Sequence, residues 1–284
     1  MSRLVLFLVA ALLAFPPGVQ PQEVVATAVE IPIESSVLQG QFFAAQTGRP
    51  LPTLLLVPGW PGGTRDVLGL GRALVGHEIN VLIFNPRGMH QSSGITSFAG
   101  ALEDIAAAFD WLHSVDVIRR FNVDTTSLTV AGHSFGGGMA LIYAARNARV
   151  RRLISIAGTD HSVLITEFER NPQFASTFRE ALRSTQHPAG PVRFDLETIL
   201  TELSRDRQVY GFRENAARLQ DRSILLLGGW DDVNTPIEAH LLPLYRALKA
   251  SGADNVEFIV YRDDHSFERV RADLATKIRE WMVR

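Results

Sequence analysis

The sequence contains no cysteine, and this absence excludes several kinds of protein at once. Without cysteine the chain forms no disulfide bond, has no catalytic thiolate and offers no thiolate ligand to zinc. A lipid anchor attached through a cysteine is excluded for the same reason. A chain of this kind is compatible with an oxidising compartment but does not require one.

A surplus of charge of either sign is also missing. The 28 Lys and Arg residues nearly balance the 30 Asp and Glu residues, which gives a formal net charge of -2. Nothing in this balance attracts a nucleic-acid backbone or an anionic lipid surface, so we expect no nucleic acid partner. Hydrophobic residues make up 46% of the chain and charged residues 20%, which is typical of a globular protein and excludes extended disorder.

The apolar run at the N-terminus is too short to cross a membrane. Residues 4–15 are uncharged and apolar, whereas a spanning helix needs roughly 20 such residues. Arg3 precedes the run and two prolines follow it, an arrangement typical of a secretory signal peptide. We predict a signal peptide over residues 1–22, export to the periplasm or the medium, and no stable membrane anchoring after processing. A buried first helix or an uncleaved anchor is the alternative.

From residue 23 onward the sequence alternates between strand-like and helix-like patterns. Apolar runs such as LLLV, VLIF and ILLL are typical of strands that are buried on both faces of a parallel sheet. The predicted strands cover residues 26–33, 37–45, 53–57, 81–84, 127–131, 152–157, 223–227 and 256–261, and the predicted helices cover residues 98–114, 134–147, 237–251 and 267–284. This alternation predicts an α/β fold, with helices on both faces of a mostly parallel sheet of about eight strands.

One connection between predicted strands is much longer than the others. Residues 159–222 contain helix-like stretches at 173–183, 196–205 and 214–219. Because a loop of this length without secondary structure is uncommon in a compact domain, we predict a helical lid insertion over one end of the sheet. The chain is then one domain, residues 23–284, that carries this insertion.

A serine between two glycines lies where a predicted strand meets a predicted helix. Gly132, Ser134 and Gly136 fit the pattern G-x-S-x-G, in which a tight strand-to-helix turn lifts the serine hydroxyl above the sheet. Small residues belong beside it because larger side chains would collide with neighbouring backbone. The pattern also occurs as a plain glycine-rich turn, but its place between a buried strand and an amphipathic helix favours a nucleophilic serine.

A nucleophilic serine requires a base that takes its proton and an acid that orients the base. Asp231 and Asp232 come just after the predicted strand 223–227, and His265 comes just after the predicted strand 256–261. Serine, acid and base therefore stand in the chain order that belongs to this kind of turn. The order alone leaves both aspartates open as the acid.

Other histidines near strand ends need a separate interpretation. His133 precedes the serine, and we interpret it as structural because adjacent residues on a turn point apart. His90 and His161 follow predicted strand ends, where a side chain can line a pocket. A loop histidine with satisfied hydrogen bonds is the simpler interpretation of both.

These motifs resemble those of the α/β-hydrolase family, and the resemblance covers residues 24–284. LLLVPGWPGG, residues 54–63, is similar to the strand and loop that supply one oxyanion-hole amide in that family. By this match the backbone N–H groups of Trp60 and Phe135 form the oxyanion hole, with Ser134 as the nucleophile and His265 as the base. FNPRGMHQSSG, residues 84–94, resembles a further family stretch, although its residues differ from the usual ones at two positions.

The segment GGWDDVNTP resembles the family pattern H-G-x-x-D-x-x-x-P. If Gly229 and Pro236 are matched to that pattern, Asp232 is the acid. If Gly228 is matched instead, the acid is Asp231. We take Asp232 as the predicted acid of a Ser-His-Asp triad.

The resemblance implies a serine hydrolase of the carboxylesterase type that needs no cofactor and no metal. We expect it to hydrolyse small-molecule carboxylic esters through an acyl-enzyme intermediate. The alternative is a prolyl-oligopeptidase-like serine peptidase that acts on short peptides, but such peptidases usually carry an additional propeller-like domain. A non-catalytic binding protein and other acyl or halide chemistry on this fold are further alternatives. The natural substrate and the oligomeric state are left open.

Overall fold

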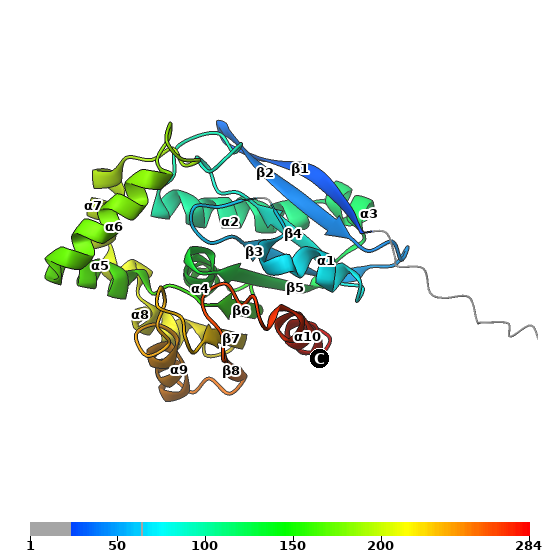
Figure 1. Cartoon of the computed structure of the whole chain (residues 1–284). Coiled ribbons are helices and arrows are strands. Elements are labelled where there is room, and N and C mark those ends of the chain that lie inside the picture. Colours follow the sequence, from blue (N-terminus) through cyan, green and yellow to red (C-terminus); the bar gives the residue numbers. More distant parts are fainter. Residues whose placement is uncertain (1–23, 64) are drawn as a thin grey trace, which may run out of the picture.

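The computed structural model describes residues 24–63 and 65–284, and the predicted signal peptide, residues 1–22, lies outside the described residues. Eight strands form one sheet in the order β1-β2-β4-β3-β5-β6-β7-β8 (Figure 1). Their bounds are β1 (Val25–Ile33), β2 (Ser36–Ala44), β3 (Leu51–Val57), β4 (Asn80–Phe84), β5 (Val123–His133), β6 (Arg152–Ile156), β7 (Ser223–Gly229) and β8 (Val256–Tyr261). Strand β2 pairs antiparallel with β1 and β4, and all other pairs are parallel. The predicted mostly parallel sheet is therefore confirmed.

The helices include several that the sequence pattern did not predict. They are α1 (Leu70–Val75), α2 (Phe98–Leu112), α3 (Val115–Phe121), α4 (Phe135–Arg146), α5 (His161–Arg170), α6 (Pro172–Thr185), α7 (Leu196–Arg205), α8 (Phe212–Ala216), α9 (Leu241–Ala250) and α10 (Arg271–Met282), with short 3-10 segments at Val67–Gly69, Arg207–Tyr210 and Ala217–Leu219. Helices α1, α3 and α5 were not predicted. The first two have six and seven residues, which is too short for an apolar repeat to stand out.

The central strands face two separate hydrophobic cores. Leu55 and Val57 of β3 pack in the core that contains residues of α2, α4 and α9. Leu54 and Leu56 of the same strand pack in the other core, with residues of α1 and α10. Successive side chains of a strand point to opposite faces, so burial on both faces requires the uninterrupted apolar run seen in the sequence.

The connection between β6 and β7 is helical and contains α5, α6, α7 and α8. In Figure 1 the first three of these helices gather beyond one end of the sheet. The segment between α6 and α7 is joined to the loop after β4: Arg193 N–H donates to the carbonyl of Gly88, and Thr96 N–H donates to the carbonyl of Arg193, both at 2.8 Å. The role of the insertion as a lid stays a prediction.

Two helices near the C-terminus begin four residues later than predicted. Residues 237–240 form a turn, and α9 begins at Leu241. Helix α10 begins at Arg271 because the buried Asp263 carboxylate accepts the N–H groups of Arg269 and Val270 and holds the preceding segment as a loop. In the part of the chain that the structure describes, no helix combines the length and apolar character that crossing a lipid bilayer requires.

Candidate active site

The turn at Ser134 is sterically crowded and its backbone is strained. Strand β5 ends at His133 and α4 begins at Phe135, and Ser134 between them has φ 56° and ψ −120°. A Cβ atom on Gly132 would lie 2.1 Å from the carbonyl oxygen of Gly136, so the turn cannot accept a side chain there. A positive φ is unfavourable for serine and persists only where the surrounding structure imposes it. The strand-to-helix turn thus places Ser134 at the carboxyl end of the central strand β5.

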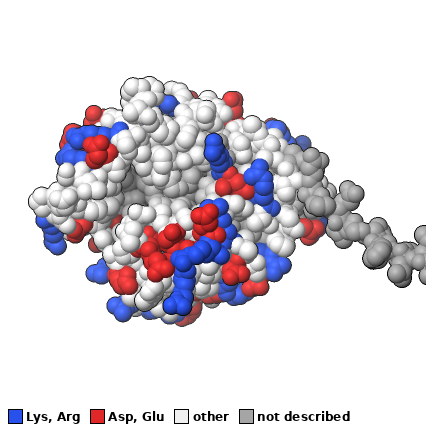
Figure 2. All heavy atoms as spheres, in the orientation of Figure 1, with Lys and Arg blue, Asp and Glu red and all other residues white. Residues whose placement is uncertain are grey.

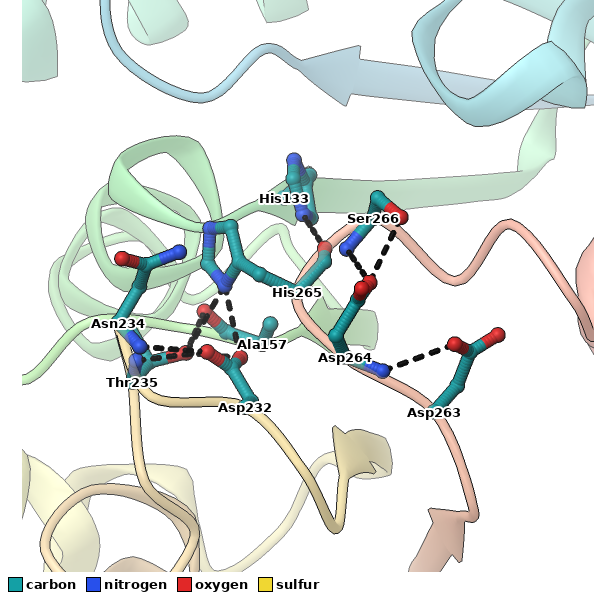
Figure 3. Close-up of polar contacts among 9 residues, drawn as sticks. All are labelled: His133, Ala157, Asp232, Asn234, Thr235, Asp263, Asp264, His265 and Ser266. Atoms are coloured by element: carbon teal, nitrogen blue, oxygen red, sulfur yellow. Dashed lines mark hydrogen bonds and ion pairs between the residues drawn. The ribbon is translucent and has the colours of Figure 1, made fainter.

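A buried carboxylate and an imidazole meet at the ends of β7 and β8. Asp232 Oδ2 accepts a hydrogen bond from His265 Nδ1 at 2.7 Å (Figure 3). Thr235 Oγ1 donates to the same oxygen at 2.7 Å, while Oδ1 accepts the backbone N–H groups of Asn234 and Thr235 at 2.8 and 2.9 Å. These hydrogen bonds reach both carboxylate oxygens, so they fix the position of the Asp232 side chain.

These contacts set the charge of Asp232 and the tautomer of His265. Burial by itself raises the pKa of Asp232, but the hydrogen bonds from His265 and Thr235 outweigh burial and lower this pKa to about 2. Asp232 is therefore ionised at neutral pH. An ionised carboxylate on Nδ1 keeps the proton on that nitrogen and leaves Nε2 of His265 free to accept one.

The neighbouring aspartate lies in a different environment. Asp231 is exposed, and its carboxylate pairs with Arg269 at 3.2 Å, while its backbone N–H donates to the carbonyl of Asp263 at 3.0 Å. Of the two aspartates that the chain order left open, the structure brings only Asp232 to His265.

His133 holds the loop that carries His265. Its Nε2 donates a hydrogen bond to the backbone carbonyl of His265 at 2.9 Å, and the two rings are 4.8 Å apart between centroids (Figure 3). Burial and the neighbouring His265 lower the pKa of His133 to about 4, so the ring is neutral at pH 7. The sequence pattern did not anticipate this contact, because it joins residues that are 132 positions apart along the chain.

Two cavities meet at Ser134, and Trp60 lines both. The larger, of about 600 Å³, is lined mainly by loop residues and includes His265; the smaller, of about 300 Å³, extends under the helical insertion. The larger cavity is lined by Pro58, Gly59, Trp60, Gly62, Gly63, Arg65, Asp66, Val67, Leu68, His90, Gln91, His133, Ser134 and His265. The smaller is lined by Trp60, Phe98, Ser134, Phe135, Thr159, His161, Leu164, Phe174, Phe178, Ala181, Leu182, Ile199, Leu200, Leu203, Val233, Asn234 and Thr235. Figure 2 shows a hollowed face, with acidic and basic side chains clustered along one side of the hollow.

The two residues predicted for the oxyanion hole lie beside the serine. A Cβ atom on Gly59 would lie 3.1 Å from Ser134 Cβ, which shows how closely the loop after β3 approaches the serine. The rings of Trp60 and Phe135 pack edge to face, with 5.8 Å between centroids. Phe135 is the first residue of α4, where a backbone N–H has no acceptor within its own helix.

The structure places His90 and His161 in the cavity walls. His90 lines the larger cavity and has a left-handed backbone, with φ 49°. His161 is buried and lines the smaller cavity, where burial and the nearby His240 lower its pKa to about 3. Neither ring nitrogen of His161 has a hydrogen-bond partner among the described residues.

Solved structures with a similar fold include esterases and a peptidase. The chain is similar to Est1E from Butyrivibrio proteoclasticus, with 17% identity and a TM-score of 0.63 over 90% of this chain and 97% of that one. An esterase from Pyrococcus furiosus has 15% identity and a TM-score of 0.66, over 92% of this chain and 91% of the esterase. An acylaminoacyl peptidase from Pyrococcus horikoshii has 16% identity and a TM-score of 0.67, over 92% of this chain but only 41% of the peptidase.

Two comparisons were made at the level of sequence. A search of curated protein sequences found no match, whereas a family model does match the chain. The model described as alpha/beta hydrolase fold matches residues 52–236, a range that begins in β3 and includes Ser134 and Asp232. The similar solved structures show the same fold. The chain belongs to the alpha/beta hydrolase fold family.

Proposed function

We propose that this protein is a serine hydrolase that cleaves carboxylic esters, with Ser134 as nucleophile, His265 as base and Asp232 as the orienting acid. The observation that carries this proposal is the placement of His265: an ionised carboxylate holds its Nδ1 at 2.7 Å, and the ring lines the same cavity as Ser134. A serine on a strained turn, a base beside it and a fixed acid behind the base form the arrangement that activates a hydroxyl nucleophile.

The reaction has two steps. His265 Nε2 takes the proton of the Ser134 hydroxyl while Oγ attacks the ester carbonyl, and the backbone N–H groups of Trp60 and Phe135 stabilise the charge that develops on the carbonyl oxygen. His265 then gives its proton to the leaving alcohol, which leaves an acyl group on Ser134. In the second step His265 takes a proton from water as the water oxygen attacks the acyl carbon. The bond from that carbon to Ser134 Oγ then breaks, and His265 returns the proton to Oγ, which releases the acid and the free serine.

The smaller cavity favours an ester over a peptide as the substrate. It extends from Ser134 beneath the insertion, and no charged side chain is among the described residues that line it. An apolar acyl chain would gain free energy by leaving water for such a surface, at roughly 25 cal/mol per Å² of apolar area. The charged amino terminus of a short peptide would find no carboxylate there. The similarity to two esterases supports the same proposal. The similarity to an acylaminoacyl peptidase supports the alternative, a serine peptidase that acts on short peptides.

Labelling combined with a substrate panel tests the proposal. The purified protein should react with a fluorophosphonate probe at Ser134, and Ser134→Ala should remove the label. Activity should then be measured on p-nitrophenyl esters of graded acyl length and on p-nitroanilide peptides. We expect hydrolysis of the esters and little of the peptides. Labelling without ester hydrolysis, together with peptide cleavage, would select the peptidase alternative; absence of labelling would reject Ser134 as an activated nucleophile.

A further inference from the structure

The smaller cavity at Ser134 is where the proposed reaction, on which this inference rests, holds the acyl chain of the ester. Ser134 lines both cavities, whereas His265 lines the larger of the two alone. Because His265 gives its proton to the leaving alcohol oxygen, the alcohol part lies on the side of the larger cavity and the acyl chain on the other side. A volume of about 300 Å³ corresponds to roughly ten water molecules of ~30 Å³ each, which is more room than an acetyl group fills.

Helices α2 and α7 supply two walls of this cavity. Phe98, the first residue of α2, lines the cavity and packs against Phe135, the residue after Ser134, with 5.6 Å between ring centroids. Three apolar residues of α7 also line it: Ile199, Leu200 and Leu203. The space open to an acyl chain therefore depends on how α7 is held against the start of α2.

The buried carboxylate of Glu202 holds these two walls together. Its Oε2 accepts the backbone N–H of Phe98 at 3.0 Å, and its Oε1 accepts the backbone N–H of Ala99 at 2.7 Å. The hydroxyl of Tyr210 donates to Oε1 at 2.9 Å. The first N–H groups of a helix have no acceptor within that helix, and the positive end of the helix dipole favours a carboxylate there. Both oxygen atoms of Glu202 thus fix α7 to the first turn of α2.

Glu202 acts on the cavity without entering it. Glu202 and Tyr210 do not line the smaller cavity, whereas Ile199 and Leu203, on the same helix as Glu202, do. Ile199 and Leu203 are four residues apart and share one face of α7. If α7 moved away from α2, this apolar wall would move with it. A gap of roughly 0.5–1 Å already removes a quarter to a half of the attraction between the wall and the atoms that it contacts.

We propose that the acyl group of the substrate is an apolar chain longer than acetyl that fills the smaller cavity, and that Glu202 is a positioning residue that sets the preference for this chain. Glu202 acts through the wall residues of α2 and α7, because it fixes the distance between the two helices.

Two esters with the same leaving group and different acyl chains test this proposal. The probes are p-nitrophenyl acetate and p-nitrophenyl hexanoate, and for wild type we expect kcat/KM to be at least about tenfold higher on the hexanoate. Roughly fourfold for each added methylene is the upper limit, which full burial would give. In Glu202→Gln one carboxylate oxygen becomes an NH₂ group, which cannot accept a backbone N–H. The ratio of hexanoate to acetate should then fall about fivefold, while kcat/KM on the acetate stays within about twofold of wild type.

Glu197→Gln is the matched control. It makes the same change on the exposed side of α7, where Glu197 pairs with Arg179, and it should keep the wild-type ratio. Tyr210→Phe is a milder variant that removes one donor to Glu202 and keeps the ring. Its ratio should fall about two- to threefold, and it decides the matter if Glu202→Gln does not fold.

The ratio of the two esters separates positioning from a structural role. A lower thermal midpoint with an unchanged ratio, or equal losses on both esters, would show that Glu202 only stabilises the fold and would overturn the proposal. A wild-type ratio near one would overturn it as well, because the smaller cavity would then not hold the acyl chain. A protein that hydrolyses neither ester and does not react with the fluorophosphonate probe would instead contradict the proposed function itself.

Discussion

The indole Nε1 of Trp60 donates a hydrogen bond to the hydroxyl of Thr185 at 2.9 Å, across 125 positions of the sequence. This bond joins the loop after β3 to the last residue of α6, and so connects the proposed oxyanion loop to the insertion. The Trp60 ring also packs edge to face against Phe194, with 5.2 Å between centroids. The orientation of Trp60 near Ser134 therefore depends on the insertion.

Replacing Thr185 by valine tests whether this bond positions the oxyanion loop. Valine keeps the shape of threonine but removes the acceptor for the indole, so the loop loses one of its fixed points. We expect Thr185→Val to lower kcat roughly tenfold with KM within about twofold, because the loop acts on the transition state rather than on ground-state binding. Thr185→Ser keeps the hydroxyl and should retain wild-type kcat. Equal losses in both variants, or a normal kcat in Thr185→Val, would show that the bond has no positioning role.

Ser134→Ala should abolish hydrolysis while the protein stays folded. Loss of an activated nucleophile lowers kcat by roughly 10⁴ to 10⁶. The measurement is ester hydrolysis at saturating substrate, with circular dichroism to show that the fold is intact. Residual kcat above about a hundredth of wild type would place the nucleophile elsewhere.

Asp232→Asn and Asp231→Asn form a matched pair that separates the two adjacent acids. Loss of the carboxylate on His265 Nδ1 favours the wrong tautomer and should lower kcat by about 10⁴. Asp231 contacts Arg269 at the surface, so Asp231→Asn should stay within about tenfold of wild type. The two kcat values should be measured side by side, and the reverse ranking would assign the acid to Asp231.

The buried His161 predicts a pH dependence of stability. Its pKa is lowered to about 3, while an unfolded histidine has a pKa near 6.5. Below pH 6.5 the unfolded state therefore binds a proton that the folded state does not, and stability falls as the pH falls. Between pH 7.5 and pH 5 this single group should reduce the free energy of unfolding by about 2 kcal/mol.

His161→Phe tests this pH dependence. The ring lies between Phe98 and Phe135, at 4.9 and 5.4 Å between centroids, so phenylalanine can occupy the same space without a titratable nitrogen. Urea unfolding at pH 7.5 and pH 5 should show a smaller loss of stability in His161→Phe than in wild type, by about 2 kcal/mol. The same pH dependence in both proteins would mean that His161 does not titrate on unfolding.

Export is a further prediction, which we base on Arg3 and the apolar residues 4–15. If the N-terminal segment is a signal peptide, the mature protein from its own cells should lack about the first twenty residues. N-terminal sequencing or intact mass measurement of fractionated cells checks this. Soluble cytoplasmic protein that retains Met1 would contradict the prediction.

Local features of the sequence were sufficient to predict the sheet, most of the longer helices and the turn at Ser134. The run LLLV in β3 is apolar because alternate residues face two cores, and this burial pattern is visible without any tertiary information. Gly132 is small because a neighbour along the chain crowds the turn: a Cβ atom there would lie 2.1 Å from the carbonyl oxygen of Gly136. Short helices such as α1 were missed because a stretch of six residues is too short to reveal an apolar repeat.

The sequence by itself therefore determined the fold class, the position of the serine turn and the chain order of the proposed serine, acid and base, because these depend on local backbone conformation and burial. Only the tertiary structure decided that Asp232 rather than Asp231 meets His265, that His133 donates to the His265 carbonyl, and that Trp60 bonds Thr185. It also decided how the two cavities divide the space at Ser134. These contacts join segments that are distant in the chain, and their geometry depends on how the strands and the insertion pack, which no local pattern encodes.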